Sequence, residues 1–103
     1  MQFGIVLRGQ FAAGENARSG FRELIEQAHL AEALGFDSIT KSQHYSTHPL
    51  QALQQIPLLS RLSGEVPNLR LNAGVVLAAL LKPLDVAEQL ASLDVMSGGK
   101  LIF

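Results

Sequence analysis

The sequence predicts an α/β fold in which parallel strands alternate with helices in the order β-α-β-α-β-α-β. Short apolar segments of strand length recur along the chain, and segments with apolar residues at helical spacing lie between them. This alternation is typical of a parallel sheet with right-handed crossover helices packed against it. The chain has 103 residues, enough for one domain with a core, so we predict a single domain over residues 1–103.

The first β-α unit is predicted over residues 3–34. Residues 3–7 are apolar and end before Gly9, so we expect a first strand that is fully buried. Residues 10–19 are mostly small or polar and predict a loop. From about Gly20 apolar residues recur at helical spacing, and Gly35 is expected to cap the helix because glycine tolerates the left-handed conformation.

The second unit is predicted from residues 36–40, which form a strand, and from the polar segment 41–48, which follows as a loop. Pro49 is expected near the start of the second helix, since proline is accepted in a first helical turn. Pro57 lies inside the predicted helix and is expected to kink or split it. The apolar face of this helix would contain Leu50, Leu53, Ile56, Leu59 and Leu62.

The third unit contains a predicted strand at residues 69–77 and a helix that begins at Lys82-Pro83. Asp85 and Glu88 lie near the beginning of this helix, where acidic residues suit the helix dipole. The segment Ser97-Gly98-Gly99 is expected to stop the helix, and residues 100–103 predict the start of a fourth strand. The apolar face of the helix would contain Val86, Ala87, Leu90 and Leu93.

The composition excludes several classes of function. Eight Lys and Arg residues against nine Asp and Glu give a net charge of −1, so we expect no binding to nucleic acid or to an anionic membrane. The absence of cysteine excludes disulfides, thiolate metal sites and a cysteine nucleophile, and fits a cytoplasmic location. The longest apolar run, residues 73–81, is too short for a membrane span, and no signal peptide is predicted.

Candidate site residues lie in the loops that follow the strands, because parallel α/β folds bind ligands at the carboxyl ends of their strands. His44 is the main candidate, since an imidazole can donate or accept a proton near neutral pH, and the alternative is a surface histidine bonded to water. Gly74 either lets a ligand approach the backbone or serves tight packing. Arg8 and Lys41 either meet an anion or face solvent.

A metal site is not predicted. His44 and His48 are four residues apart, which suits metal binding on a helix, but Pro49 favours a loop and no third ligand is evident. Gly98-Gly99 is assigned to the helix stop rather than to a phosphate cradle. The chain also lacks the glycine-rich fingerprints of dinucleotide-binding and P-loop proteins.

Six segments follow one another at characteristic spacings along the chain: 3–7 (FGIVL), 31–39 (AEALGFDSI), 43–45 (QHY), 69–77 (LRLNAGVVL), 82–88 (KPLDVAE) and 93–101 (LDVMSGGKL). Taken in their order and spacing, these segments resemble the luciferase-like monooxygenase family, whose members use reduced FMN or a reduced deazaflavin. The resemblance implies the N-terminal part of a (β/α)8 TIM barrel that is incomplete in this chain, with the flavin at the carboxyl face of the strands.

The resemblance also implies roles for individual residues. His44 matches the histidine that lies near the reactive isoalloxazine ring and is linked to flavin–oxygen chemistry, where it would act as a proton donor or base. Gly74 and Val75 match the segment that backs the ring, often through a non-proline cis bond. Gln43 departs from the acidic residue that many members have, and Lys82 departs from a histidine. The phosphate-binding residues are expected beyond Phe103.

The implied function is that of an N-terminal fragment of a flavin-dependent monooxygenase or oxidoreductase that uses reduced FMN and acts on a small organic substrate. We expect the 103-residue chain to be inactive alone. The resemblance implies a dimer through the second and third helices, and the unpaired strand edges and uncovered apolar face of a partial barrel independently predict a homo-oligomer. One alternative is a fragment of a deazaflavin-dependent oxidoreductase, which would transfer hydride without activating oxygen. The other is a non-catalytic folding or interaction module. The substrate pocket would be formed mainly by later loops.

Overall fold

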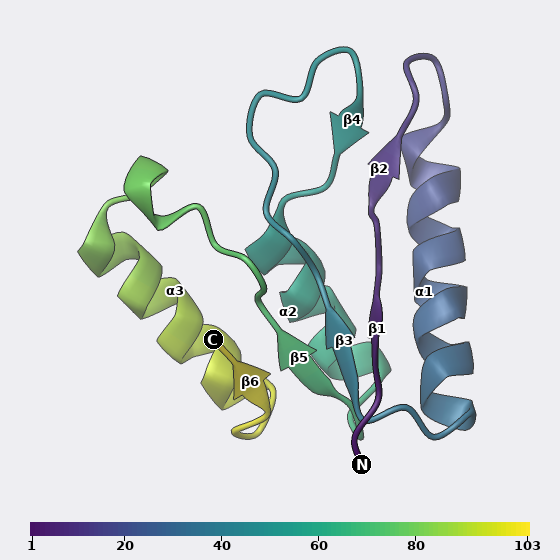
Figure 1. Cartoon of the computed structure of the whole chain (residues 1–103), viewed down its shortest axis with the longest axis vertical. Coiled ribbons are helices and arrows are strands. Elements are labelled where there is room, and N and C mark those ends of the chain that lie inside the picture. Colours follow the sequence, from purple (N-terminus) through teal and green to yellow (C-terminus); the bar gives the residue numbers. More distant parts are fainter.

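A parallel four-stranded sheet forms the centre of the computed structural model, which describes all residues from 1 to 103 (Figure 1). The strands are arranged in the sheet in the order β1-β3-β5-β6, and every neighbouring pair is parallel. Strand order therefore follows chain order, as the predicted alternation of strands and helices requires. The bounds are β1 Gly4–Val6, β3 Ser38–Thr40, β5 Arg70–Asn72 and β6 Leu101–Ile102.

Three helices connect these strands: α1 (Ala17–Ala33), α2 (Gln55–Glu65) and α3 (Pro83–Met96). Helix α1 begins earlier than predicted, because the Asn16 side chain accepts hydrogen bonds from the backbone N–H groups of its first turn. Its end was predicted correctly, since Gly35 follows it with a φ of +79°. Helix α3 begins at Pro83 and ends before Gly98, both as predicted.

The second helix was predicted with the wrong beginning. It starts at Gln55, not near Pro49, and Pro49 precedes a short strand, β4 (Gln51–Ala52). This strand pairs antiparallel with β2 (Gln10–Phe11), which lies in a segment predicted to be a loop. Pro57 is the third residue of α2, where a backbone N–H would have no acceptor within the helix. The helix therefore continues through Pro57 without a break.

The strands are shorter than predicted and are buried on one face only. Strand β5 ends at Asn72, and residues 73–77 continue irregularly to a short 3-10 helix, η1 (Ala78–Leu80). Ile39 and Leu71 point toward the helices and are fully buried, whereas Val6 points to the opposite face and is 60% exposed. The prediction of a fully buried first strand was wrong, because nothing in this chain covers the second face of the sheet.

The hydrophobic core lies between the sheet and the helices. Its members alternate along the strands and recur at helical spacing in the helices, as the sequence pattern predicted. Ala87 was expected on the buried face of α3 but is exposed. No helix is both long and apolar enough to cross a membrane. The helix residues of the core are Leu24, Ala28, Ala31, Leu58, Leu59, Leu62, Leu90 and Leu93.

Candidate functional site

The carboxyl ends of β1, β3 and β5 meet at one edge of the sheet, where the register places Val6, Thr40 and Asn72 side by side. The Asn72 Nδ2 group donates a hydrogen bond of 3.2 Å to Thr40 Oγ1. This pair gives the uncovered sheet face a polar patch at its carboxyl edge. The sequence analysis missed both residues, although a polar residue at alternate positions of an apolar strand was an available signal.

The segment Gly74-Val75 continues from β5 at this edge. The peptide bond between Gly74 and Val75 is cis, as the family resemblance implied. A Cβ at residue 74 would lie 3.0 Å from Asn72 Oδ1, so Gly74 packs closely against the Asn72 side chain. Val75 is 67% exposed. The segment thus packs closely against Asn72 of β5 at Gly74 and presents the Val75 side chain on the surface.

Gln43 joins the loop after β3 to the segment after β5. Its backbone N–H donates to the Val75 carbonyl at 3.1 Å, and its side-chain Oε1 accepts from the Leu77 N–H at 2.7 Å. An acidic side chain at this position could accept the same hydrogen bond from Leu77. The Gln43 side chain is therefore engaged with Leu77 rather than with His44.

Two consecutive glutamines at the beginning of α2 complete this connection. The Nε2 group of Gln55 donates to the carbonyls of Lys41 and Val75, and Gln55 is only 2% exposed. The Nε2 group of Gln54 donates to the His44 carbonyl at 3.3 Å. Gln55 was missed because the helix was predicted to begin too early. With the correct beginning, a polar residue on the same helix face as buried Leu58 is a recognisable signal.

His44 lies half-buried in the loop that follows β3. The contacts of Gln43 and Gln54 connect its loop to Gly74-Val75 and to α2, so the structure brings the three predicted site residues to the same edge. His48 is exposed and precedes a cis proline farther along the loop. The structure contains no group of three or more His, Asp or Glu side chains placed to hold a metal ion.

Lys41 does not occupy either of its predicted environments. Its side chain is fully buried, its Nζ group donates to the Ser42 carbonyl at 2.7 Å, and the end of its stem packs against Gly9. Burial lowers the pKa of Lys41 below its ordinary value, because desolvation disfavours the charged form. The predictions of an anion contact and of a solvent-facing position were both wrong. Arg8 is exposed at the end of β1, in agreement with the solvent-facing alternative.

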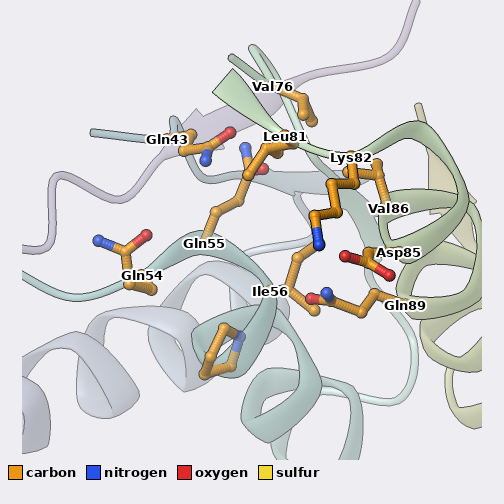
Figure 2. Close-up of a pocket in the computed structure, with 11 residues that line it drawn as sticks. Gln43, Gln54, Gln55, Ile56, Val76, Leu81, Lys82, Asp85, Val86 and Gln89 are labelled. Carbon is orange, nitrogen blue, oxygen red and sulfur yellow. The ribbon is translucent and has the colours of Figure 1, made fainter. Parts of the chain in front are cut away.

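A cavity of about 340 Å³ lies between the beginnings of α2 and α3 (Figure 2). Gln43 and Gln55 line it, so the cavity borders the connection between the two loops, whereas His44 and Gly74 are not among its lining residues. The predicted site residues His44, Gly74 and Val75 therefore lie outside the lining of this cavity. The other polar residues that line the cavity are Gln54, Lys82, Asp85 and Gln89.

Together, the parallel sheet, its outer helices and the loops at its carboxyl edge define part of a β/α barrel with a candidate ligand site on the carboxyl face. Comparison with known families identifies the barrel type. The model of the family described as luciferase-like monooxygenase matches residues 1–103, so the chain belongs to that family.

Individual relatives agree with this assignment. A luciferase-like monooxygenase of Escherichia coli strain K12 is 26% identical over 88 residues, which are 85% of this chain. The crystal structure of the monooxygenase RslO1 from Streptomyces bottropensis shares 31% identity over 98% of this chain, with a TM-score of 0.83.

Two further solved structures share the fold at lower identity. The oxygenating constituent of 3,6-diketocamphane monooxygenase from Pseudomonas putida, in complex with FMN, has a TM-score of 0.87 over the whole chain at 21% identity. The coenzyme F420-dependent tetrahydromethanopterin reductase of Methanopyrus kandleri has a TM-score of 0.75 over 98% of the chain at 23% identity.

The chain spans only part of each relative. It covers 26% of the Escherichia coli protein and 31%, 28% and 25% of the Streptomyces, Pseudomonas and Methanopyrus chains. The fold is therefore a partial barrel, as predicted.

Proposed function

We propose that this chain supplies the first three β-α units of a flavin-dependent monooxygenase that uses reduced FMN and acts on a small organic substrate. Gly74 and Val75 would back one face of the isoalloxazine ring, and His44 would lie beside the ring. The observation that carries the proposal is the connection of the His44 loop to the Gly74-Val75 segment through Gln43.

The residues at the carboxyl edge suit one face of a flat aromatic ring. The exposed Val75 side chain offers apolar contact, and Asn72, which is paired with Thr40, packs against the adjacent Gly74. A reduced flavin supplies electrons to oxygen or to the substrate when it is bound. The part of this chain would be to bind the ring, to exclude water from one side, and to hold or move a proton at the His44 imidazole.

Two features favour FMN as the cofactor without deciding against a deazaflavin. The Pseudomonas relative was solved with FMN, and RslO1, the most identical of the three structures described, is a monooxygenase. The Methanopyrus relative is dependent on coenzyme F420, so a deazaflavin-dependent oxidoreductase is the second candidate function. A non-catalytic folding or interaction module remains the third.

A flavin titration tests the proposal. We expect a polypeptide that contains these residues together with the remaining barrel strands to bind FMN saturably, as followed by quenching of flavin fluorescence. The isolated 103-residue chain should show no saturable binding at micromolar concentration, because its open sheet face provides only part of one ring wall. A half-open site would also admit water to the ring.

Each other outcome of this titration points to a different function. Binding of a deazaflavin in preference to FMN would favour the second candidate. Binding of neither cofactor would favour the non-catalytic module. Saturable FMN binding by the isolated chain would contradict the expected inactivity, and would require a partner subunit to complete the site.

We also propose that the protein forms a homo-oligomer. The sheet has edges at β1 and β6, and α3 presents Leu84 and Val95 to solvent. Exposed apolar faces and unpaired strand edges are typical of surfaces that associate. Sedimentation velocity at micromolar concentration should therefore show a dimer or larger species, and a stable monomer would contradict this proposal.

A further inference from the structure

We infer that Gln55 is a positioning residue for the cofactor wall, and that its side-chain amide sets the orientation of Val75 at the carboxyl edge. This inference rests on the proposed function, because it takes Val75 to face a flavin. It adds a residue in α2 whose side chain would not touch the cofactor.

The environment of Gln55 requires a specific partner for its amide. The residue is 2% exposed and lies on the buried face of α2 with Leu58 and Leu59. Burial of an unpaired amide is costly, and an apolar side chain would serve packing at this position without that cost. The amide nitrogen carries two hydrogens, and it meets two carbonyl acceptors, those of Lys41 and Val75. The Nε2 donor is therefore fully used.

The carbonyl of Val75 is held from two sides. It accepts from the Gln55 Nε2 group at 3.2 Å and from the Gln43 backbone N–H at 3.1 Å. A carbonyl oxygen has two lone pairs, so both are engaged by protein donors. Because the peptide group is planar, fixing this carbonyl restricts rotation of the backbone at Val75 and hence the direction of its side chain.

The bond to Val75 does more than attach α2 to the sheet. The bond from Gln55 to the carbonyl of Lys41, directly after β3, would by itself tie the helix to the sheet. Val75, in contrast, lies outside regular structure and is 67% exposed, so side-chain packing contributes little to its position. The hydrogen bonds from Gln55 and Gln43 are consequently what holds this residue in place.

Two variants at residue 55 separate positioning from packing. Gln55→Met keeps an unbranched side chain of similar length but cannot donate a hydrogen bond. When it is ionised, the side chain of Gln55→Glu has only acceptor oxygens, which cannot bond to the carbonyls of Lys41 and Val75. When it is protonated, it regains one O–H donor. Both variants are made in the polypeptide that contains the remaining strands. The readouts are the FMN dissociation constant and the visible circular dichroism of the fully bound oxidised flavin.

We expect both variants to bind FMN about tenfold more weakly at about pH 8, because the Val75 carbonyl loses the hydrogen bond from the buried Gln55 amide. We also expect an altered visible circular dichroism spectrum at saturation. Lowering the pH to about 5 should restore part of the affinity and of the spectrum in Gln55→Glu but not in Gln55→Met, because only the acid regains a donor. Gln27→Glu and Gln27→Met, at an exposed position of α1, are the matched controls and should behave like the parent.

The outcomes separate this inference from the proposed function. If the parent protein binds neither FMN nor a deazaflavin, both the proposed function and the positioning role of Gln55 are contradicted. Parent protein that binds FMN, with Gln55 variants of equal affinity and spectrum, would overturn the positioning role alone. Reduced thermal stability with an unchanged spectrum at saturation would likewise assign Gln55 to packing.

A measurement on the unaltered protein covers the case in which the Gln55 variants do not fold. The two side-chain N–H signals of Gln55 in 15N-resolved NMR should exchange slowly with solvent and shift when FMN is added. Rapid exchange, or signals that FMN leaves unchanged, would overturn the inference.

Discussion

In the polypeptide that also contains the remaining barrel strands, replacement of His44 by alanine is expected to lower turnover of the flavin-loaded protein by about 10²-fold or more, the usual scale for loss of a positioned acid or base. His44 lies half-buried at the carboxyl edge, and the Gln54 side chain holds its backbone carbonyl. A small side chain at this position should leave that backbone contact intact. The FMN dissociation constant should therefore change much less than the turnover number, and both quantities are measured on the same preparation.

His48→Ala is the matched control for this prediction. His48 lies in the same loop, is exposed, and is separated from His44 by three residues. We expect its replacement to leave turnover close to that of the parent protein. Equal turnover of His44→Ala and the parent would mean that His44 is only a loop histidine. A loss of turnover that is matched by an equal loss of FMN affinity would assign His44 to cofactor binding instead of proton transfer.

Replacement of Lys41 by methionine is expected to stabilise the protein at neutral pH by about 1 kcal/mol, the scale of the penalty for a buried polar group that is incompletely paired. The Lys41 side chain is fully buried, and its only hydrogen bond is to the Ser42 carbonyl. Methionine keeps most of the aliphatic stem that packs against Gly9. The melting temperature should rise by a few degrees.

The effect of Lys41 on stability should depend on pH. Burial lowers the pKa of Lys41 in the folded state below the ordinary value of 10.5. Below the folded pKa both states carry the proton, so the folded state bears the full cost of the buried charge. Between the folded pKa and 10.5 the unfolded state binds more protons, and the stability contributed by this residue rises with pH. The advantage of Lys41→Met should therefore decrease as the pH is raised toward 10.5.

Lys82→Met is the matched control, because Lys82 is exposed. Its free energy of unfolding should stay within about 0.5 kcal/mol of the parent value at every pH. If Lys41→Met instead destabilised the protein, with no dependence on pH, the hydrogen bond to Ser42 would outweigh the cost of burial. Chemical denaturation at several pH values measures the free energy of unfolding of each variant and its dependence on pH.

The order of the elements follows from the sequence pattern alone. Strand and helix periods are local properties, since a strand exposes alternate residues to one face and a helix repeats every 3.6 residues. Gly35 and Pro83 were placed correctly at helix ends, because left-handed backbone and a first helical turn each favour one residue type. The family resemblance added the partial barrel and the cis bond after Gly74.

The beginning of the second helix could not be predicted from local pattern. Pro49 suits a first helical turn equally well, but the antiparallel pairing of β4 with β2 holds that segment in an extended conformation. This pairing joins residues about forty positions apart, and nothing local in either segment specifies it. The error in the helix also hid Gln55, whose importance depends on which face of the helix it occupies.

The environment of the site residues was likewise decided by tertiary structure. Lys41 and Thr40 are adjacent polar residues, but alternation along β3 buries Lys41 on the helix side and turns Thr40 toward the open face. Gln43 bonds to Leu77 and Gln55 bonds to Val75, both in the third β-α unit, and these contacts are set by the register of β3 against β5. The sequence by itself thus determined the class of fold, the family and the loop that contains His44. Which side chains meet at the carboxyl edge was decided only by strand register, because hydrogen bonds between distant segments leave no periodic trace in the sequence.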